Sequence, residues 1–194
     1  MAVNLLLVLL AIASLALAES FTLTAYAPGH RAIHGQPLNA DGSHFLIGLE
    51  VPFTYCPALP SISCPPGVST VVDEDLTHLR VATPGGQAIY IPPSGLVSYT
   101  RAHSSYMPPG SATAGFYPKV LASDCSAEVS RVLDFVSADG AGLAGVYACP
   151  NPDTPSTWLL VAAGRQSRAL RGDCVLLEGL EMRASDVDIG AWQY

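Results

Sequence analysis

Short apolar or alternating runs, separated by turn residues, make up most of this chain. Residues 21–27 (FTLTAYA) alternate apolar and polar side chains with a period of two, which is typical of a half-buried strand. Residues 33–50 hold two strand-like arms around Asn39-Ala40-Asp41-Gly42, a favourable hairpin turn. Residues 78–93 repeat that layout around Pro84-Gly85-Gly86. The pattern predicts strands that pair through short turns.

The segment 85–110 is rich in Tyr and Ser and contains His103, so catalytic chemistry is one interpretation of it. Its Gly-Gly, Pro-Pro-Ser-Gly and Pro-Pro-Gly groups favour turns, because Gly tolerates positive φ and Pro fixes φ. Tyr90 and Tyr99 fall in strand-like runs, where aromatic side chains pack well on a pleated surface. We therefore predict that this segment supplies strands and turns.

Frequent turns between strand-like runs predict an all-β fold. Only residues 123–136 are compatible with a short helix, with Ser123 or Asp124 as its N-cap, and a strand fits the same residues. Three hairpin-bearing portions favour a single compact β-barrel or β-trefoil-like domain with at most one short helix. A β-sandwich is the alternative. The three portions lie near 21–50, 78–100 and 132–163.

The first residues have the features of a secretory signal. Residues 5–18 are almost wholly apolar but too short to span a bilayer comfortably, and Ala16-Leu17-Ala18 has the form of a signal peptidase site. We predict a signal peptide at 1–18 and a single secreted all-β domain at 19–194. No later stretch is apolar enough to span, so no membrane partner is expected after cleavage.

Charge narrows the range of partners. The chain has 194 residues, a formal net charge of −7 and one lysine, Lys119. Nucleic acid is not an expected partner, because the chain offers no basic patch to displace phosphate counterions. A mildly acidic surface is typical of an extracellular protein. The sequence does not indicate an oligomeric state.

Five cysteines are expected to pair where geometry permits, because a secreted protein meets an oxidising environment. Cys56 and Cys64 flank a short Pro-rich loop, and Cys149 and Cys174 lie beside strand-like runs. These two bridges would contribute about 2.5 and about 3.5 kcal/mol in the chain-entropy model. Cys125 would then be the odd thiol, and other pairings stay open. The spacing fits no zinc site, so neither a metal nor a cofactor is expected.

Histidine and serine residues do not form a recognisable catalytic motif. His103 lies beside Ser104-Ser105, but no nucleophile elbow precedes a helix, so we expect no triad. His30 and His34 are spaced for a shared metal only on a helix, whereas they lie between strand-like runs. We expect these imidazoles to be hydrogen-bonded or exposed, and we predict no catalytic residue.

Carboxylates and tryptophans are further candidates for chemistry on sugars. Glycosidase chemistry needs two carboxylates across a cleft, and the sequence does not select a pair, so solvated surface is the default. Trp158 and Trp192 are expected in the core or at its rim. Arg171-Gly172-Asp173 is interpreted as a turn rather than an adhesion motif. The carboxylates considered are Asp73-Glu74-Asp75, Asp134, Asp139, Glu178 and Glu181.

Several segments share their order with a known family. They are AIHGQPLNADGSHFLIG (32–48), TYCP (54–57), the block 81–110, ACP (148–150), Trp158, Asp173-Cys174 and the final Tyr194. Together they resemble a family of fungal secreted proteins that includes the phialide-associated cell-wall protein PhiA and IgE-binding wall proteins. The resemblance covers most of the mature chain and is most specific over 81–110. At IGAWQY (189–194) the chain departs from the family, because Trp192 stands near the place of an expected cysteine, which would leave Cys125 over.

The resemblance implies a secreted, non-enzymatic wall or surface protein, linked in some members to conidiophore and phialide development and to cell-wall integrity. The alternative is a carbohydrate-binding module that uses exposed aromatic side chains, with wall polysaccharide as the expected partner. A secreted hydrolase or host-directed effector is the second alternative. Two carboxylates in a cleft, or Ser and His in hydrogen-bond contact, would favour the hydrolase.

Overall fold

A computed structural model describes residues 19–122, 129–137, 143–164 and 172–194, and regular structure in these ranges consists of strands. The described ranges contain no helix, and hence none long and apolar enough to cross a membrane. The strands are β1 (Phe21–Tyr26), β2 (Leu38–Asp41), β3 (His44–Ile47), β4 (His78–Leu79), β5 (Gln87–Tyr90), β6 (Ser98–Tyr99), β7 (Phe116–Ala122), β8 (Val129–Phe135), β9 (Val146–Pro150), β10 (Trp158–Ala162), β11 (Val175–Leu177) and β12 (Gly179–Ala184).

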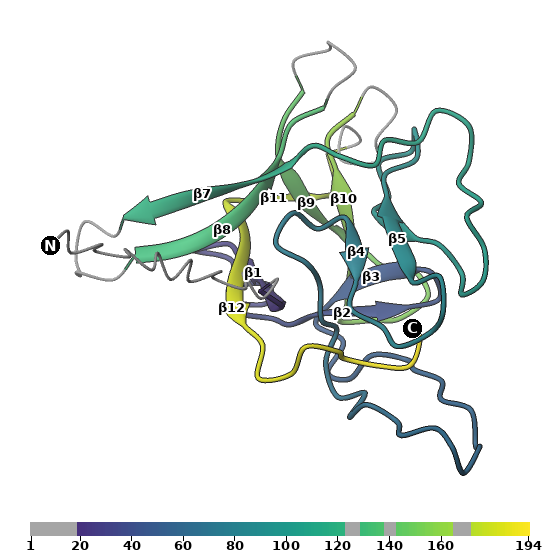
Figure 1. The fold of residues 1–194 in the computed structure, drawn as a ribbon. Coiled ribbons are helices and arrows are strands. Elements are labelled where there is room, and N and C mark those ends of the chain that lie inside the picture. The colour runs from purple at the N-terminus through teal and green to yellow at the C-terminus, as the bar shows by residue number, and fades with distance from the viewer. Residues whose placement is uncertain (1–18, 123–128, 138–142, 165–171) are drawn as a thin grey trace, which may run out of the picture.

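The described strands form two antiparallel sheets (Figure 1). Sheet A has the order β1-β12-β8-β7, and β7 with β8 extends from the body as a long arm (Figure 1). Sheet B has the order β11-β9-β10-β3-β6-β5-β4, with β2 paired to β3. Strands distant in the sequence lie side by side, because β1 pairs with β12 and β3 pairs with β10.

The main hydrophobic core draws buried side chains from both sheets. Sheet A supplies Leu23 and Leu133, and sheet B supplies Phe45 and Leu160, all within one contiguous cluster. The alternation read from residues 21–27 is observed in β1, where Phe21, Leu23 and Ala25 are buried and the residues between them are only partly buried. Period-two patterning therefore decides which side of each sheet faces the core.

The all-β prediction is confirmed, and the arrangement is the sandwich-like alternative. The barrel or β-trefoil placed first is not observed, because the hairpins do not follow one another around a closed sheet. The helix considered over 123–136 is not formed in its described part, since 129–135 is strand β8 paired to β7. Residues 123–128, including Cys125, and the signal peptide expected at 1–18 lie outside the described residues.

The β2–β3 hairpin closes two residues later than its predicted turn. Asp41 pairs with His44, so the loop consists of Gly42 and Ser43. Both have positive φ, 58° and 70°, which is the conformation of a two-residue hairpin turn that matches strand twist. Glycine adopts this conformation without a steric penalty, and Asn39 remains inside β2.

Among the described residues, two disulfides reinforce the fold. Cys56 is bonded to Cys64 and Cys149 to Cys174, the pairs suggested by their positions in the sequence. The first bond lies within the loop between β3 and β4. The second lies on the face of sheet B opposite the main core, where buried Cys149 packs with Val161 in a smaller cluster.

The final residues of the chain are held between distant segments. The Tyr194 hydroxyl donates to the Ser69 carbonyl at 2.7 Å and accepts from the Val71 N–H at 3.1 Å. The buried Gln87 amide accepts from the Tyr194 N–H at 2.8 Å and donates to its carbonyl at 2.9 Å. A Cβ at Gly190 would collide with the Tyr194 hydroxyl, so this approach requires glycine.

Candidate functional site

A pocket of about 520 Å³ lies beside the turn of the β2–β3 hairpin. The ends of β5 and β6 and the segment that follows β6 complete it. We call it the tyrosine pocket. Its lining residues are Gly42, Ser43, His44, Tyr90, Tyr99, Thr100, Arg101, Ser104 and Tyr106. Small-molecule pockets commonly have this size and combine aromatic walls with a few polar groups.

Tyr99 is the most deeply buried aromatic residue of the tyrosine pocket. Its ring packs edge-on against Phe45, with centroids 5.4 Å apart. Its hydroxyl accepts a hydrogen bond from the Ser43 N–H at 3.2 Å, which ties the pocket to the hairpin turn. Burial raises the pKa of Tyr99 to about 12, although the Ser43 hydrogen bond opposes the shift. The residue therefore stays neutral at physiological pH.

His44 adds a neutral imidazole to the same pocket. Its Nδ1 lies 3.1 Å from the Ser98 hydroxyl, which itself donates to the Leu96 carbonyl at 2.8 Å. Ser98 therefore accepts from Nδ1–H, and Nε2 carries the lone pair of this tautomer. Burial lowers the pKa of His44 below its usual value, against the opposing charge of Asp41. The imidazole can thus accept a hydrogen bond from a ligand hydroxyl.

The rim of the tyrosine pocket is formed by a turn after β6. The Ser104 N–H donates to the Arg101 carbonyl at 3.1 Å, and His103 adopts a positive φ of 62° within this turn. The Tyr106 N–H then donates to the Ser104 hydroxyl at 3.2 Å. Arg101 and Tyr106 are both exposed, and Tyr106 is 72% exposed. The rim thus presents an aromatic ring and a guanidinium group to solvent.

The Ser–His contact in the structure differs from the one considered in the sequence. Ser98 meets His44, whereas His103 and Ser104 occupy an exposed turn. Ser98 is buried and donates its proton to Leu96 rather than to the imidazole. A catalytic serine needs the opposite arrangement, in which the imidazole accepts the hydroxyl proton. The contact therefore suits a structural role for Ser98 and a tautomer-setting role toward His44.

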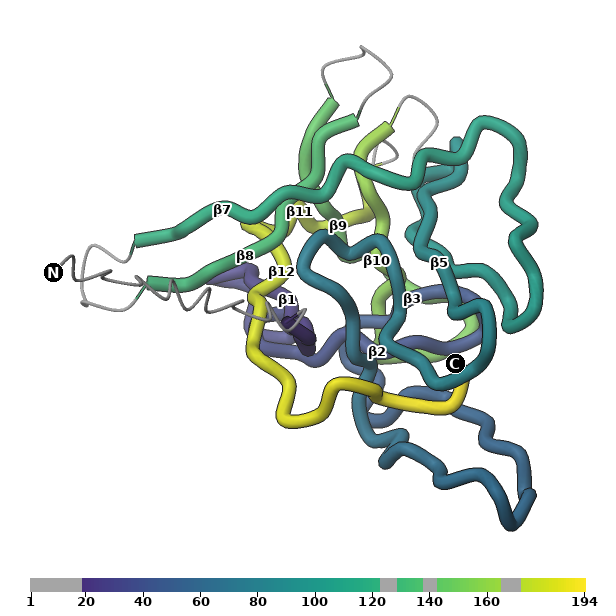
Figure 2. Tube along the Cα trace, in the orientation of Figure 1, coloured from purple at the N-terminus to yellow at the C-terminus, as the bar shows by residue number. Residues whose placement is uncertain are grey.

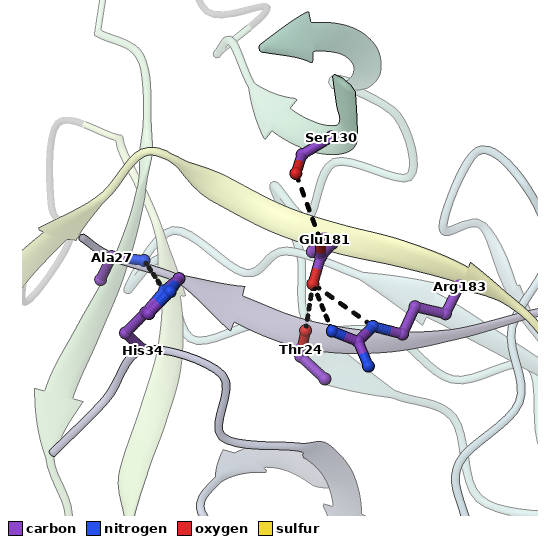
Figure 3. A network of polar contacts seen from close by, with 6 residues as sticks. All are labelled: Thr24, Ala27, His34, Ser130, Glu181 and Arg183. Atoms are coloured by element: carbon purple, nitrogen blue, oxygen red, sulfur yellow. Dashed lines mark hydrogen bonds and ion pairs between the residues drawn. The ribbon is translucent and has the colours of Figure 1, made fainter. Parts of the chain in front are cut away.

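Glu181 lies in a polar network on sheet A (Figure 3). Its carboxylate accepts from Arg183 at 2.9 Å and from the hydroxyls of Thr24 and Ser130 at 3.3 Å each. Burial raises the pKa of Glu181, but the hydrogen bonds and charge of Arg183 and the two hydroxyls outweigh it and hold the pKa below its ordinary value. A general acid needs the reverse shift, so this carboxylate is suited to joining β1, β8 and β12.

Two other candidate carboxylates share a second cavity of about 380 Å³. Asp134 and Glu178 line it together with Lys119. The Lys119 ammonium donates to Asp134 at 2.6 Å, and the Phe135 N–H donates to the other oxygen at 2.8 Å. These contacts hold the Asp134 carboxylate at a fixed position in the cavity wall. Asp139, considered with them in the sequence, lies outside the described residues.

The remaining histidine and acidic candidates take part in local contacts. The exposed His34 accepts from the Ala27 N–H at 3.2 Å through Nδ1 (Figure 3), and His30 begins the same turn. Asp73 accepts from the backbone and hydroxyl of Thr77. Within the described ranges, no group of three or more His, Cys, Asp or Glu side chains could hold a metal ion.

The tryptophans and the Arg-Gly-Asp tripeptide are placed as follows. Trp158 is partly buried against the main core, and Trp192 is half-buried with its carbonyl accepting from the Thr83 N–H. Gly172 and Asp173 are exposed, while Arg171 lies outside the described residues. Sequence reasoning missed the tyrosine pocket because His44 and Arg101 are far apart in the chain. The available signal was the run of Tyr, Ser and Arg in 85–110, which was interpreted as strands and turns alone.

Comparisons with known proteins identify a family and a secreted relative. A family model described as PhiA-like secreted protein matches residues 21–194. An uncharacterized secreted protein of Arthroderma benhamiae is 34% identical over 176 residues, which cover 89% of this chain and 84% of the relative. No solved structure matches the chain.

Proposed function

The chain belongs to the PhiA-like secreted protein family, and from this premise we propose that it is a non-enzymatic protein of the fungal wall that binds wall polysaccharide through the tyrosine pocket. The family and the relative are secreted proteins. Location in the wall, polysaccharide as the partner and the tyrosine pocket as the binding site are what we propose. The finer role that we propose is support of wall integrity during conidiophore and phialide development.

The composition of the tyrosine pocket is the observation that carries the proposal. A sugar ring has apolar C–H faces and a rim of hydroxyl groups, so it requires aromatic surfaces and mixed hydrogen-bonding groups. Tyr90 and Tyr106 provide the aromatic surfaces, and the buried Tyr99 anchors the wall behind them. Arg101 supplies donors, and neutral His44 supplies an acceptor. The pocket carries no carboxylate among its lining residues, which suits a ligand that needs binding rather than acid–base chemistry.

The sharpest test uses purified protein and three soluble oligosaccharides, derived from chitin, β-glucan and mannan. Tyr106→Ala removes an exposed ring, and we expect it to weaken binding of the recognised oligosaccharide by about tenfold or more. Tyr117→Ala is the matched control, because Tyr117 is also an exposed tyrosine but lies on β7, outside the pocket. Equal binding by wild type and Tyr106→Ala would refute the site.

The pH dependence of binding provides a second measure of the same site. His44 accepts a ligand hydrogen bond only while it is neutral, and burial keeps its pKa below the usual value. Affinity should therefore be retained at neutral pH and lost as the pH falls through the pKa of His44, which lies below the ordinary histidine value of about 6.5. The variant His44→Gln should abolish this dependence. A flat profile in the wild type would remove His44 from the proposed contacts.

Polysaccharide hydrolysis is the second candidate function, because Asp134 and Glu178 line one cavity. The same oligosaccharides allow a direct assay, in which newly formed reducing ends are measured over time. We expect none above the buffer rate. Turnover that Glu178→Gln or Asp134→Asn abolishes would replace the binding proposal with an enzymatic one.

A role in the wall predicts a phenotype in the fungus. Deletion of the gene should increase sensitivity to wall-perturbing dyes and disturb phialide formation. Complementation with the wild-type gene should restore both, whereas the Tyr106→Ala gene should restore them less well. Full complementation by the pocket variant would separate the developmental role from polysaccharide binding.

A further inference from the structure

The loop between β3 and β4 concentrates exposed apolar side chains. We call residues 51–68 the apolar loop; it stands away from the two sheets (Figure 2). It holds five of the eleven exposed large apolar residues in the described part of the chain, and each is more than half exposed. They are Val51, Phe53, Tyr55, Leu59 and Val68. Such concentrations on a monomer surface commonly mark interaction sites.

Three of these residues alternate along the chain with residues that are less exposed. Val51, Phe53 and Tyr55 are exposed, while Pro52 between the first two is buried. Alternate residues of an extended chain point to the same side at intervals of about 6.6 Å. The row therefore presents one aliphatic and two aromatic side chains in a line.

Backbone hydrogen bonds hold this row in place. The Phe53 N–H donates to the Ala40 carbonyl at 3.0 Å. Tyr55 and Gln193 exchange two backbone hydrogen bonds, of 3.1 and 3.3 Å, as an antiparallel bridge. The row is thus attached to β2 on one side and to the C-terminal segment on the other. A surface that is ordered before binding loses less entropy when it binds.

The rest of the apolar loop is also constrained. The Cys56–Cys64 disulfide closes its tip directly after Tyr55. The Gly67 N–H donates to the Gly190 carbonyl at 2.8 Å, which fixes the returning end of the loop. Five prolines within it limit the backbone further; they are Pro52, Pro57, Pro60, Pro65 and Pro66.

The apolar loop also lacks charge. From Val51 to Val72 the chain contains no Asp, Glu, Lys, Arg or His, although the whole chain has a net charge of −7. The β7–β8 arm differs, because its exposed apolar residues are interleaved with the Lys119–Asp134 ion pair and with Arg131, which pairs with Glu74. A partner of the loop is therefore recognised without ionic contacts.

We propose that the row Val51-Phe53-Tyr55 is a second polysaccharide-binding surface, which lies flat on the apolar face of an uncharged, insoluble glycan. A fixed line of side chains is complementary to an extended polymer whose sugar rings repeat along one direction. Aromatic rings stack on the C–H faces of such sugars, and neither partner carries charge. The inference does not depend on the tyrosine pocket, which would take a single chain end or branch. The row would contact the surface of the packed polymer.

Binding isotherms on insoluble polymer test the row. The Phe53→Ser/Tyr55→Ser double variant should bind chitin or β-glucan particles at least tenfold more weakly, because two large apolar side chains no longer leave water. Val120→Ser is the matched control, since Val120 is 67% exposed on β7. The Phe53→Tyr/Tyr55→Phe variant, which keeps both rings, should retain binding. Thermal unfolding must show that each variant is folded.

Separate measurements distinguish polysaccharide binding at the row from binding at the tyrosine pocket and from binding of other partners. Weaker particle binding by the double variant, with unchanged binding of soluble oligosaccharides, supports the row. Tyr106→Ala should show the converse pattern. Unchanged binding of the double variant to every insoluble glycan overturns the proposal. It is also overturned if the wild type binds no particles but binds phosphatidylcholine vesicles or dimerises in solution in a manner that the double variant loses. Those results would assign the row to a lipid surface or to a second copy of the chain.

Discussion

Replacement of Tyr194 by Phe should destabilise the protein through loss of a single oxygen atom. The ring and its packing remain, while the hydroxyl that bridges Ser69 and Val71 is removed. The Val71 side chain is fully buried, so its N–H has little access to water once its acceptor is gone. This variant therefore isolates a hydrogen-bonding contribution from a packing contribution.

The magnitude follows from the two bonds that are lost. A buried N–H without a partner costs about 1–3 kcal/mol, and the hydrogen bond to the Ser69 carbonyl contributes about 1 kcal/mol net. The free energy of unfolding should thus fall by about 2–4 kcal/mol. For a domain of this size, each kcal/mol lowers Tm by about 2–4 °C, so Tm should fall by about 4–16 °C.

Urea unfolding followed by circular dichroism measures this change, and calorimetry provides Tm. Tyr106→Phe is the matched control, because Tyr106 is largely exposed and its hydroxyl can be replaced by water. We expect the control to change the free energy of unfolding by less than about 0.5 kcal/mol. A similarly small effect for Tyr194→Phe would show that the Tyr194 hydroxyl does not stabilise the contact with Ser69 and Val71, which would refute this prediction.

Three further predictions concern stability. The Cys149→Ala/Cys174→Ala variant loses a bond between residues 25 apart, which the chain-entropy model values at about 3.5 kcal/mol, so calorimetry should show Tm lower by about 7–14 °C. Gly179→Ala should cost more than about 1 kcal/mol in urea unfolding, because φ is 151° and the new Cβ would lie 2.7 Å from Val132 Cγ2. Burial raises the pKa of Tyr99 to about 12, above the unfolded value of about 10. The stabilising contribution of neutral Tyr99 is complete below pH 10 and declines as the pH rises toward 12. The urea midpoint should therefore fall between about pH 10 and pH 12 as tyrosinate absorbance appears.

Local patterning carried most of the correct fold prediction. Alternation in residues 21–27 identified β1, and the turn residues in 33–50 identified the β2–β3 hairpin, because both signals depend on neighbours in the chain. The turn itself was misplaced toward Asn39. The Asn39 amide instead donates to the Leu49 and Glu50 carbonyls from within β2. Turn propensity does not include such a tertiary contact.

The architecture depended on pairings that local patterns do not encode. Three similar hairpins favoured a barrel or trefoil, yet β10 pairs with β3 as well as with β9. Residues 129–135 carried a spacing compatible with a helix, but pairing with β7 and β12 makes them a strand. In both cases tertiary contacts outweighed the local preference.

The two candidate sites differ in how far the sequence alone predicts them. The tyrosine pocket joins His44 to residues that follow β6, so no single stretch of sequence contains it. The apolar loop was visible as an uncharged, Pro-rich run with two cysteines. Its exposure was not, because an apolar residue such as Phe53 is usually assigned to a core until coordinates show otherwise.

The pairing of β1 with β12 has a consequence for export. Phe21 lies opposite Ala184, so sheet A cannot close until nearly all of the polypeptide has emerged from the translocation pore. Sequential contacts form quickly, whereas such distant ones form slowly, and the nascent chain should remain unfolded and threadable during its passage. A secreted protein benefits from this order of events, since it becomes rigid only in the compartment where its cysteines are oxidised.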